Sequence, residues 1–158
     1  MTLHTVEVRT DELYDRRVEP EPLRRAALAT LAHQRIEGPC ELTVVVTGDE
    51  ALRELNRRHR GVDAPTDVLA FPDEVGGPFV GAPGLPRYLG DVIISFPRAE
   101  AQAAEAENEL QAELQLLVVH GVLHLLGYDD QTEPERATMW KAQQTILDGL
   151  GVEVRLPD

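Results

Sequence analysis

The stretch Leu116-Leu-Val-Val-His120-Gly-Val-Leu-His124-Leu-Leu-Gly127-Tyr-Asp-Asp130 joins an apolar helical run to two histidines, a glycine and a carboxylate. Residues four apart in a helix lie on one face, so the imidazoles of His120 and His124 would project together and could hold one ion. Gly127 can adopt the left-handed turn that ends a helix, which would bring a side chain near Asp130 back toward the histidines. The stretch therefore predicts a central helix with a three-ligand metal site at its end, open to water.

The alternative for this pair is two hydrogen-bonded histidines that bind no metal on an apolar helix. However, two of only five histidines lie in the most apolar segment of an acidic chain, where burying them without a role is costly. Cys40 is the only cysteine, which excludes a thiolate cluster and an intrachain disulfide, so nitrogen and oxygen must be the ligands. An open zinc site of this kind activates water and indicates a hydrolase, although another divalent metal fits the same ligands.

Strands and helices are expected to alternate irregularly on either side of this helix. Strands are expected at residues 3–9, 41–47, 67–71 and 88–95. One helix is expected at 22–37, and a second from a cap at Thr47 or Asp49 to about Arg58. A long helical pattern runs from about Pro97 to Leu126, with a break near Asn108. A last helix is expected from Pro134 to about Leu147, before Gly149. This order predicts an α+β fold, in which one mixed sheet of about four strands packs against helices.

The chain of 158 residues has the length of one domain, so residues 1–158 are interpreted as a single metallohydrolase domain. Residues 72–87 hold four prolines and four glycines, and they are interpreted as a loop insertion. The N-terminal residues have no apolar signal-peptide core, and no stretch is long and apolar enough to span a membrane. The protein is expected to be cytoplasmic, without a membrane partner.

A net charge of −13 opposes loose, charge-driven binding to nucleic acid. The basic residues are unevenly spread, since Arg53, Arg57, Arg58 and Arg60 fall within eight positions. These arginines form either a local basic patch for a polyanion or a solvated helix face paired with Glu50 and Glu54.

Three segments of the chain form a recognisable set. They are Leu55-Asn-Arg-Arg-His-Arg60 with Pro65-Thr-Asp-Val-Leu-Ala-Phe71, then Gly90-Asp-Val-Ile-Ile-Ser95, then His120-Gly-Val-Leu-His-Leu-Leu-Gly-Tyr-Asp129. Together they resemble the YbeY family of bacterial metal-dependent endoribonucleases, which act in ribosomal RNA maturation and ribosome quality control. The likeness spans most of residues 40–150. It implies a single-strand-specific endoribonuclease with one zinc ion per chain, and as partners single-stranded or ribosomal RNA, the ribosomal subunit or its assembly factors.

The resemblance also implies roles for individual residues. The family's metal is carried by three histidines, of which the first two correspond to His120 and His124. The third corresponds to Asp130, a departure that brings negative charge to the site, and Asp129 is the competing ligand. Arg60 corresponds to the family's arginine, which implies a catalytic role on the substrate phosphate.

Arg57 and Arg58 are expected to assist Arg60 in binding the substrate. The alternative for Arg60 is a surface ion pair with Asp63 or Asp67. Thr66 and Asp67 also match the family, and we assign them a structural role, which is to cap or fix the loop before the strand from Val68 to Phe71.

Three other functions are compatible with parts of the sequence. A ribosome-assembly protein with a structural metal and marginal nuclease activity fits the acidic charge. A metalloprotease-like hydrolase fits the histidine pair, but Gly121 stands where zinc proteases of that type carry their glutamate base. A non-haem iron oxygenase matches the ligand types, but the sequence shows no co-substrate site.

Overall fold

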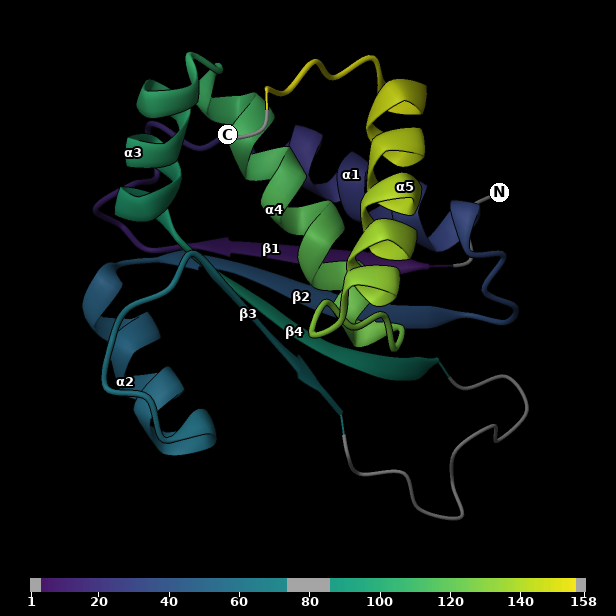
Figure 1. The fold of residues 1–158 in the computed structure, drawn as a ribbon, viewed down its shortest axis with the longest axis horizontal. Coiled ribbons are helices and arrows are strands. Elements are labelled where there is room, and N and C mark those ends of the chain that lie inside the picture. The colour runs from purple at the N-terminus through teal and green to yellow at the C-terminus, as the bar shows by residue number, and fades with distance from the viewer. Residues whose placement is uncertain (1–3, 74–85, 156–158) are drawn as a thin grey trace.

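The computed structural model describes residues 4–73 and 86–155. The elements follow the order β1 (Thr5–Thr10), α1 (Pro20–His33), β2 (Cys40–Thr47), α2 (Asp49–Arg60), β3 (Val68–Pro72), β4 (Arg87–Ser95), α3 (Phe96–Ala106), α4 (Leu110–Leu125) and α5 (Glu133–Leu150). The expected α+β class is confirmed, because the strands form one mixed sheet packed against helices (Figure 1).

The described strands pair in the order β1-β2-β4-β3. β2 is parallel to both β1 and β4, and Val44 lies opposite Val8 on one side and Val92 on the other. β3 runs antiparallel to β4, with Leu69 opposite Ile93. Two β-branched strands therefore occupy the centre of the sheet, where packing on a pleated surface favours such residues.

Helix α4 lies at the centre of the helical layer. It contacts β3 and β4 of the sheet as well as α1, α3 and α5. Its side chains are buried almost without interruption from Ala112 to Leu123. A helix that is apolar all round is stable only when other elements surround it, which is why this segment is the core helix. In Figure 1, α1, α3 and α5 lie with α4 on one side of the strands, and α2 lies on the other.

The helical pattern expected from Pro97 to Leu126 is divided near Asn108, as predicted. Glu107 ends α3 in the left-handed conformation with φ of 59°. Asn108 then donates to the carbonyl of Arg155 over 2.8 Å and to the Glu113 carboxylate over 3.2 Å. The break separates α3 from α4 and ties the junction to the C-terminal segment.

Three helix ends differ from the sequence expectation. Helix α1, expected to reach residue 37, ends at His33. The N-cap of α2 is Gly48, rather than Thr47 or Asp49, and no side chain caps the helix. Asp49 instead accepts a hydrogen bond from the Ser95 hydroxyl over 2.6 Å, so a tertiary contact occupies the carboxylate. At the other end of the chain, α5 continues through Gly149 to Leu150 and ends at Gly151, which has φ of 73°.

The predicted loop insertion at 72–87 falls mostly outside the described residues, which omit 74–85. At its two ends, Pro72 closes β3 and Arg87 opens β4. Among the helices of the described segments, none has both the length and the apolar character needed to cross a bilayer.

Candidate metal centre

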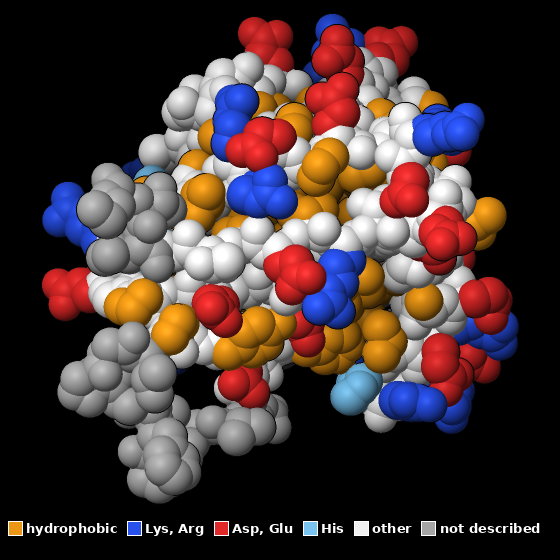
Figure 2. Space-filling model, turned by 180° about the vertical axis from the view of Figure 1, so that it is seen from behind, with side chains coloured by type: hydrophobic (Ala, Val, Ile, Leu, Met, Phe, Trp, Pro, Cys, Tyr) orange, Lys and Arg blue, Asp and Glu red, His pale blue; other side chains and the backbone are white. Residues whose placement is uncertain are grey.

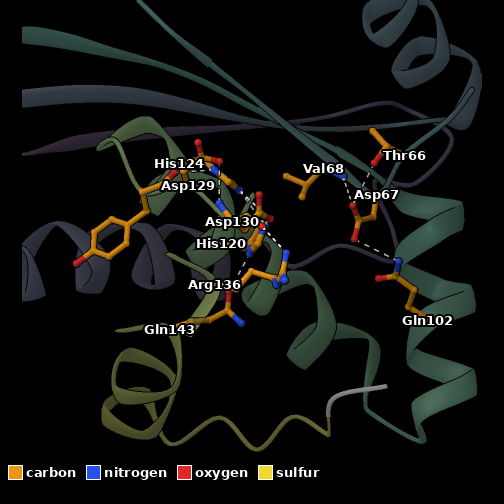
Figure 3. A network of polar contacts seen from close by, with 11 residues as sticks. Thr66, Asp67, Val68, Gln102, His120, His124, Asp129, Asp130, Arg136 and Gln143 are labelled. Carbon is orange, nitrogen blue, oxygen red and sulfur yellow. Dashed lines mark hydrogen bonds and ion pairs between the residues drawn. The ribbon is translucent and has the colours of Figure 1, made fainter. Parts of the chain in front are cut away.

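Two histidines face each other at the C-terminal end of α4. His120 and His124 lie one helical turn apart, and their Nε2 atoms are 3.1 Å from each other. The Oδ2 atom of Asp130 lies 3.8 Å from Nε2 of His120 and 3.7 Å from Nε2 of His124. The three predicted ligands are therefore gathered into one cluster, which we call the His/His/Asp triad and which could hold a metal ion (Figure 3).

Hydrogen bonds on the far side of each ring determine the tautomers. Nδ1 of His124 lies 2.9 Å from the carbonyl oxygen of Tyr128, which can only accept, so Nδ1 carries the proton. Nδ1 of His120 lies 3.0 Å from the Oε1 atom of Gln143 and donates to it in the same way. Each neutral ring therefore turns an unprotonated Nε2 toward the other ring.

Two facing lone pairs at this separation repel each other unless a cation lies between or beside them. A metal ion satisfies both nitrogens, and Asp130 adds an anionic oxygen to the same position. The end of α4 adds a second favourable contribution, because the carbonyl end of a helix carries partial negative charge. The donor set of the triad thus fits a divalent ion, and the bonds from Gln143 and the Tyr128 carbonyl orient its rings.

The turn after α4 explains how Asp130 reaches the histidines. Gly127 has φ of 101°, the conformation that Gly127 was predicted to supply. The N–H of Tyr128 bonds to the carbonyl of Leu123 over 3.0 Å, and that of Gly127 bonds to the carbonyl of His124 over 3.0 Å. These two backbone hydrogen bonds reverse the chain at the end of the helix. It places the Tyr128 carbonyl against His124 and Asp130 beside the rings.

Asp129, the competing third ligand, is engaged elsewhere. Its Oδ1 atom accepts the backbone N–H of Asp130 over 2.8 Å. Its side chain thereby stabilises the turn, and the carboxylate that faces the two Nε2 atoms belongs to Asp130.

Burial and charge favour the ligand form of His120. The pKa of His120 is lowered, first because burial disfavours the imidazolium and second because His124 lies beside it. The neutral ring is the form that binds a metal. The exposed side-chain fraction is 22% for His120 but 41% for Asp130, so the triad is covered by the protein on one side and open to solvent on the other.

The arginines predicted to bind substrate lie on α2 and make no contact with the triad within the described residues. Arg57 and Arg58 pair with Glu54 at 2.7 Å and 3.1 Å, as the solvated-face alternative predicted. In Figure 2, basic and acidic side chains lie beside one another over this face of the molecule. Arg60 differs from them: it is exposed at the end of α2, and neither Asp63, which pairs with Arg53, nor Asp67 holds it in the described structure.

Two residues of α5 belong to the site and were missed by sequence reasoning. Gln143 orients His120, and Arg136 donates to the backbone carbonyl of Asp130 over 3.1 Å (Figure 3). Gln143 carried a recognisable signal, because it is a polar residue on a helix face whose neighbours Met139, Ala142 and Ile146 are buried. Arg136 carried none, since it stands among exposed residues.

Asp67 lies beside the triad and has the structural role that was expected of it. Its Oδ1 atom accepts the N–H of Val68 over 2.8 Å and the Thr66 hydroxyl over 3.4 Å. Its Oδ2 atom accepts from Gln102 of α3 over 3.2 Å. Its negative charge also acts on His120 and opposes the lowering of that pKa.

Comparison with known proteins identifies the family. The model of the family "Endoribonuclease YbeY" matches residues 8–151. Among curated proteins, the chain is 44% identical over 148 residues to endoribonuclease YbeY of Roseiflexus castenholzii, covering 93% of each protein. It is 47% identical over 152 residues to that of Chloroflexus aurantiacus, covering 95% of this chain and 97% of the relative.

A solved structure agrees in fold. The solution structure of a Thermotoga maritima protein superposes with a TM-score of 0.56 at 22% identity, covering 92% of this chain and 91% of that one. At this identity the likeness concerns the fold alone. The family match and the curated relatives span nearly the whole chain, and together they show that this protein belongs to the endoribonuclease YbeY family.

Proposed function

We propose that this protein is a metal-dependent endoribonuclease that cleaves single-stranded RNA and acts in ribosomal RNA maturation and ribosome quality control. Zinc is the proposed metal, held by His120, His124 and Asp130. The observation that carries the proposal is the pair of Nε2 atoms, 3.1 Å apart, beside a carboxylate. Two imidazole nitrogens and one carboxylate oxygen form a known catalytic set for zinc. Family membership supports RNA as the substrate.

The side chains around the triad orient the metal ligands so that a phosphodiester can approach the metal. When bound, the metal supplies a Lewis acid that offsets negative charge on the phosphodiester. Nδ1 of His120 donates to Gln143 and Nδ1 of His124 donates to the Tyr128 carbonyl, so each ring presents Nε2 to the metal. The carboxylate of Asp130 lies on the solvent side, where substrate arrives.

Arg60 is the proposed catalytic residue that binds a phosphate of the RNA, with Arg57 and Arg58 assisting. A planar guanidinium offers forked donors that match phosphate oxygens. Arg60 is exposed, and no described carboxylate pairs with it, so binding a phosphate would break no ion pair. Arg57 and Arg58 share Glu54, so they would contribute charge to the same face of α2.

Metal content measured by mass spectrometry on untagged protein tests the ligand set. Wild type is expected to carry near-stoichiometric metal, and His124→Ala and Asp130→Ala are expected to lose it. Asp129→Asn is the matched control, because the amide oxygen can still accept the Asp130 N–H, so its metal content should not change. If wild type binds no zinc, manganese or nickel, the proposal of a metal-dependent nuclease fails.

Cleavage of a single-stranded RNA tests the role of Arg60. Arg60→Ala is expected to lower cleavage while the bound metal remains. Arg25→Ala is the control, since this exposed arginine lies on α1. Equal cleavage by wild type and Arg60→Ala would remove the proposed role. The 3′ end of the product identifies the attacking group, because a cyclic phosphate would exclude direct hydrolysis by water.

A further inference from the structure

A cavity of about 830 Å³ opens next to the triad, between α3, α4 and α5. His120 and Gln143 form part of its wall, and Leu116 and Leu117 of α4 supply apolar surface. Its volume is within the range of about 300–1,000 Å³ typical of small-molecule pockets. The triad alone needs no such space, so the cavity offers room for a part of the substrate beyond the reacting phosphate.

Trp140 supplies an aromatic surface to this cavity. It lines the wall with 38% of its surface exposed, although tryptophan favours burial. It stands three residues before Gln143, so the two side chains lie on neighbouring positions of one face of α5. Gln143 in turn bonds to His120, which puts the indole about one helical turn from a residue that orients a metal ligand.

The charges of the cavity determine what can enter it. Four carboxylates line the wall, from Asp67, Glu105, Glu107 and Glu113. The one cationic side chain among the lining residues, Arg155, is already paired with Glu107 at 2.9 Å. A phosphate would be repelled here, whereas a neutral group that presents N–H donors to carboxylate oxygens would be accepted. The cavity therefore suits a nucleobase better than the RNA backbone.

We propose that this cavity binds one nucleobase of the RNA, from a nucleotide adjoining the phosphodiester at the triad, and that the base stacks on the indole of Trp140. The inference rests on the proposed nuclease function. Unpaired bases can be turned out of a single strand and stacked on aromatic side chains, whereas a base within a duplex must first be unpaired and unstacked at a cost in free energy. The pocket therefore gives a physical reason for the proposed preference for single strands, and it selects bases whose edges carry N–H donors.

Tryptophan fluorescence tests the proposal directly, because Trp140 is the only tryptophan of the chain. The metal-loaded protein is titrated with a short single-stranded RNA and with a ribose-phosphate strand of equal length that carries no bases. Stacking predicts saturable quenching by the RNA and none by the abasic strand. Equal quenching by both strands, or no quenching by either, would overturn the pocket.

Cleavage kinetics give a second readout. Stacking on an aromatic side chain contributes an amount that corresponds to about fivefold or more in affinity for each base. Trp140→Leu should therefore raise KM at least about fivefold with kcat and metal content held, and Trp140→Phe should restore most of the loss. Tyr88→Leu is the control, since Tyr88 is similarly exposed at 37% but lies on β4 and does not line the cavity.

The two proposals fail in different ways. Quenching by RNA in a metal-loaded protein that cleaves no RNA would contradict the nuclease function and leave the pocket standing. Normal cleavage with an unchanged KM in Trp140→Leu would contradict the pocket and leave the nuclease standing.

Discussion

Gln143 shows how a single residue outside the triad controls it. Its Oε1 atom holds the Nδ1 proton of His120 and so turns Nε2 toward the metal position. Without this hydrogen bond the imidazole ring can rotate, or its proton can occupy Nε2 instead of Nδ1. Partners of this kind orient a ligand and raise its basicity.

Replacing Gln143 by Ala should weaken metal binding about 10- to 100-fold while the fold persists. Competition with a zinc-chelating dye measures the affinity. Gln144→Ala is the matched control, because Gln144 is exposed and bonds only to Asp148 among the described residues. Equal zinc affinity in the two variants would show that the amide has no part in the site.

Glu113 is a buried carboxyl group, with 4% of its surface exposed. Its pKa is raised above the ordinary value of 4.5, chiefly by burial and to a smaller degree by the charge of Asp67, while the bond from Asn108 opposes the shift. A carboxyl whose pKa is higher in the folded state destabilises the fold when it ionises. This cost is absent below the unfolded pKa, grows as the pH rises past it and is complete above the folded pKa.

Glu113→Gln should therefore raise the melting temperature at pH 8, and the gain should shrink as the pH falls toward 4.5. Thermal unfolding across this pH range measures the effect. Glu37→Gln, at an exposed position, serves as control and should show no comparable trend. A gain for Glu113→Gln that does not change with pH would contradict the assignment to ionisation.

At the scale of elements, the crossing of α4 over β4 depends on a glycine. A Cβ atom at Gly121 would collide with Cγ1 of Val92 and lie 3.3 Å from Cγ2 of Val68. Only a residue without a side chain lets the helix approach the sheet this closely. The same contact explains why this position cannot carry the glutamate of a zinc protease, because a longer side chain would force α4 away from the sheet.

Gly121→Ala should lower the free energy of unfolding by about 1–3 kcal/mol, because overpacking outweighs the better helix propensity of alanine. Gly149→Ala in α5 is the matched control: no atom lies within 4 Å of its added Cβ. That control should stabilise the protein by about 0.5–1 kcal/mol. Chemical denaturation measures the free energy of unfolding of both variants. A Gly121→Ala variant more stable than wild type would contradict the close packing of α4 on the sheet.

At the scale of the whole molecule, a net charge of −13 must be reconciled with an RNA substrate. The face of α2 offers little free positive charge, because Arg53, Arg57 and Arg58 are paired with carboxylates. We therefore expect binding to rest on a metal, a few guanidinium groups and the proposed base stacking rather than on a broad basic surface.

The affinity for single-stranded RNA should accordingly depend weakly on salt. Each phosphate neutralised on a single strand contributes about −0.7 to the slope of log K against log salt, so one or two contacts predict a slope of about −1. Fluorescence anisotropy between about 50 and 200 mM salt measures it. A slope steeper than about −4 would require a larger basic surface and would contradict this mode of binding.

The sequence by itself determined the features that depend on local spacing. The helical placement of His120 and His124, the reversal at Gly127 and the break near Asn108 follow from backbone periodicity and from conformations open to a few residue types. The α+β class could be predicted for the same reason. The end of α5 could not, since Gly149 signals a stop but Gly151 provides it.

Only the tertiary structure decided which side chains from other parts of the chain surround the triad. Gln143 meets His120 from 23 residues away, and Trp140 and Arg136 reach the site on the same helix. The position of Asp130, rather than Asp129, beside the histidines likewise depends on which carboxylate the turn uses for its own backbone. These contacts arise because α5 packs against α4, and packing between helices depends on three-dimensional fit, which local spacing does not encode.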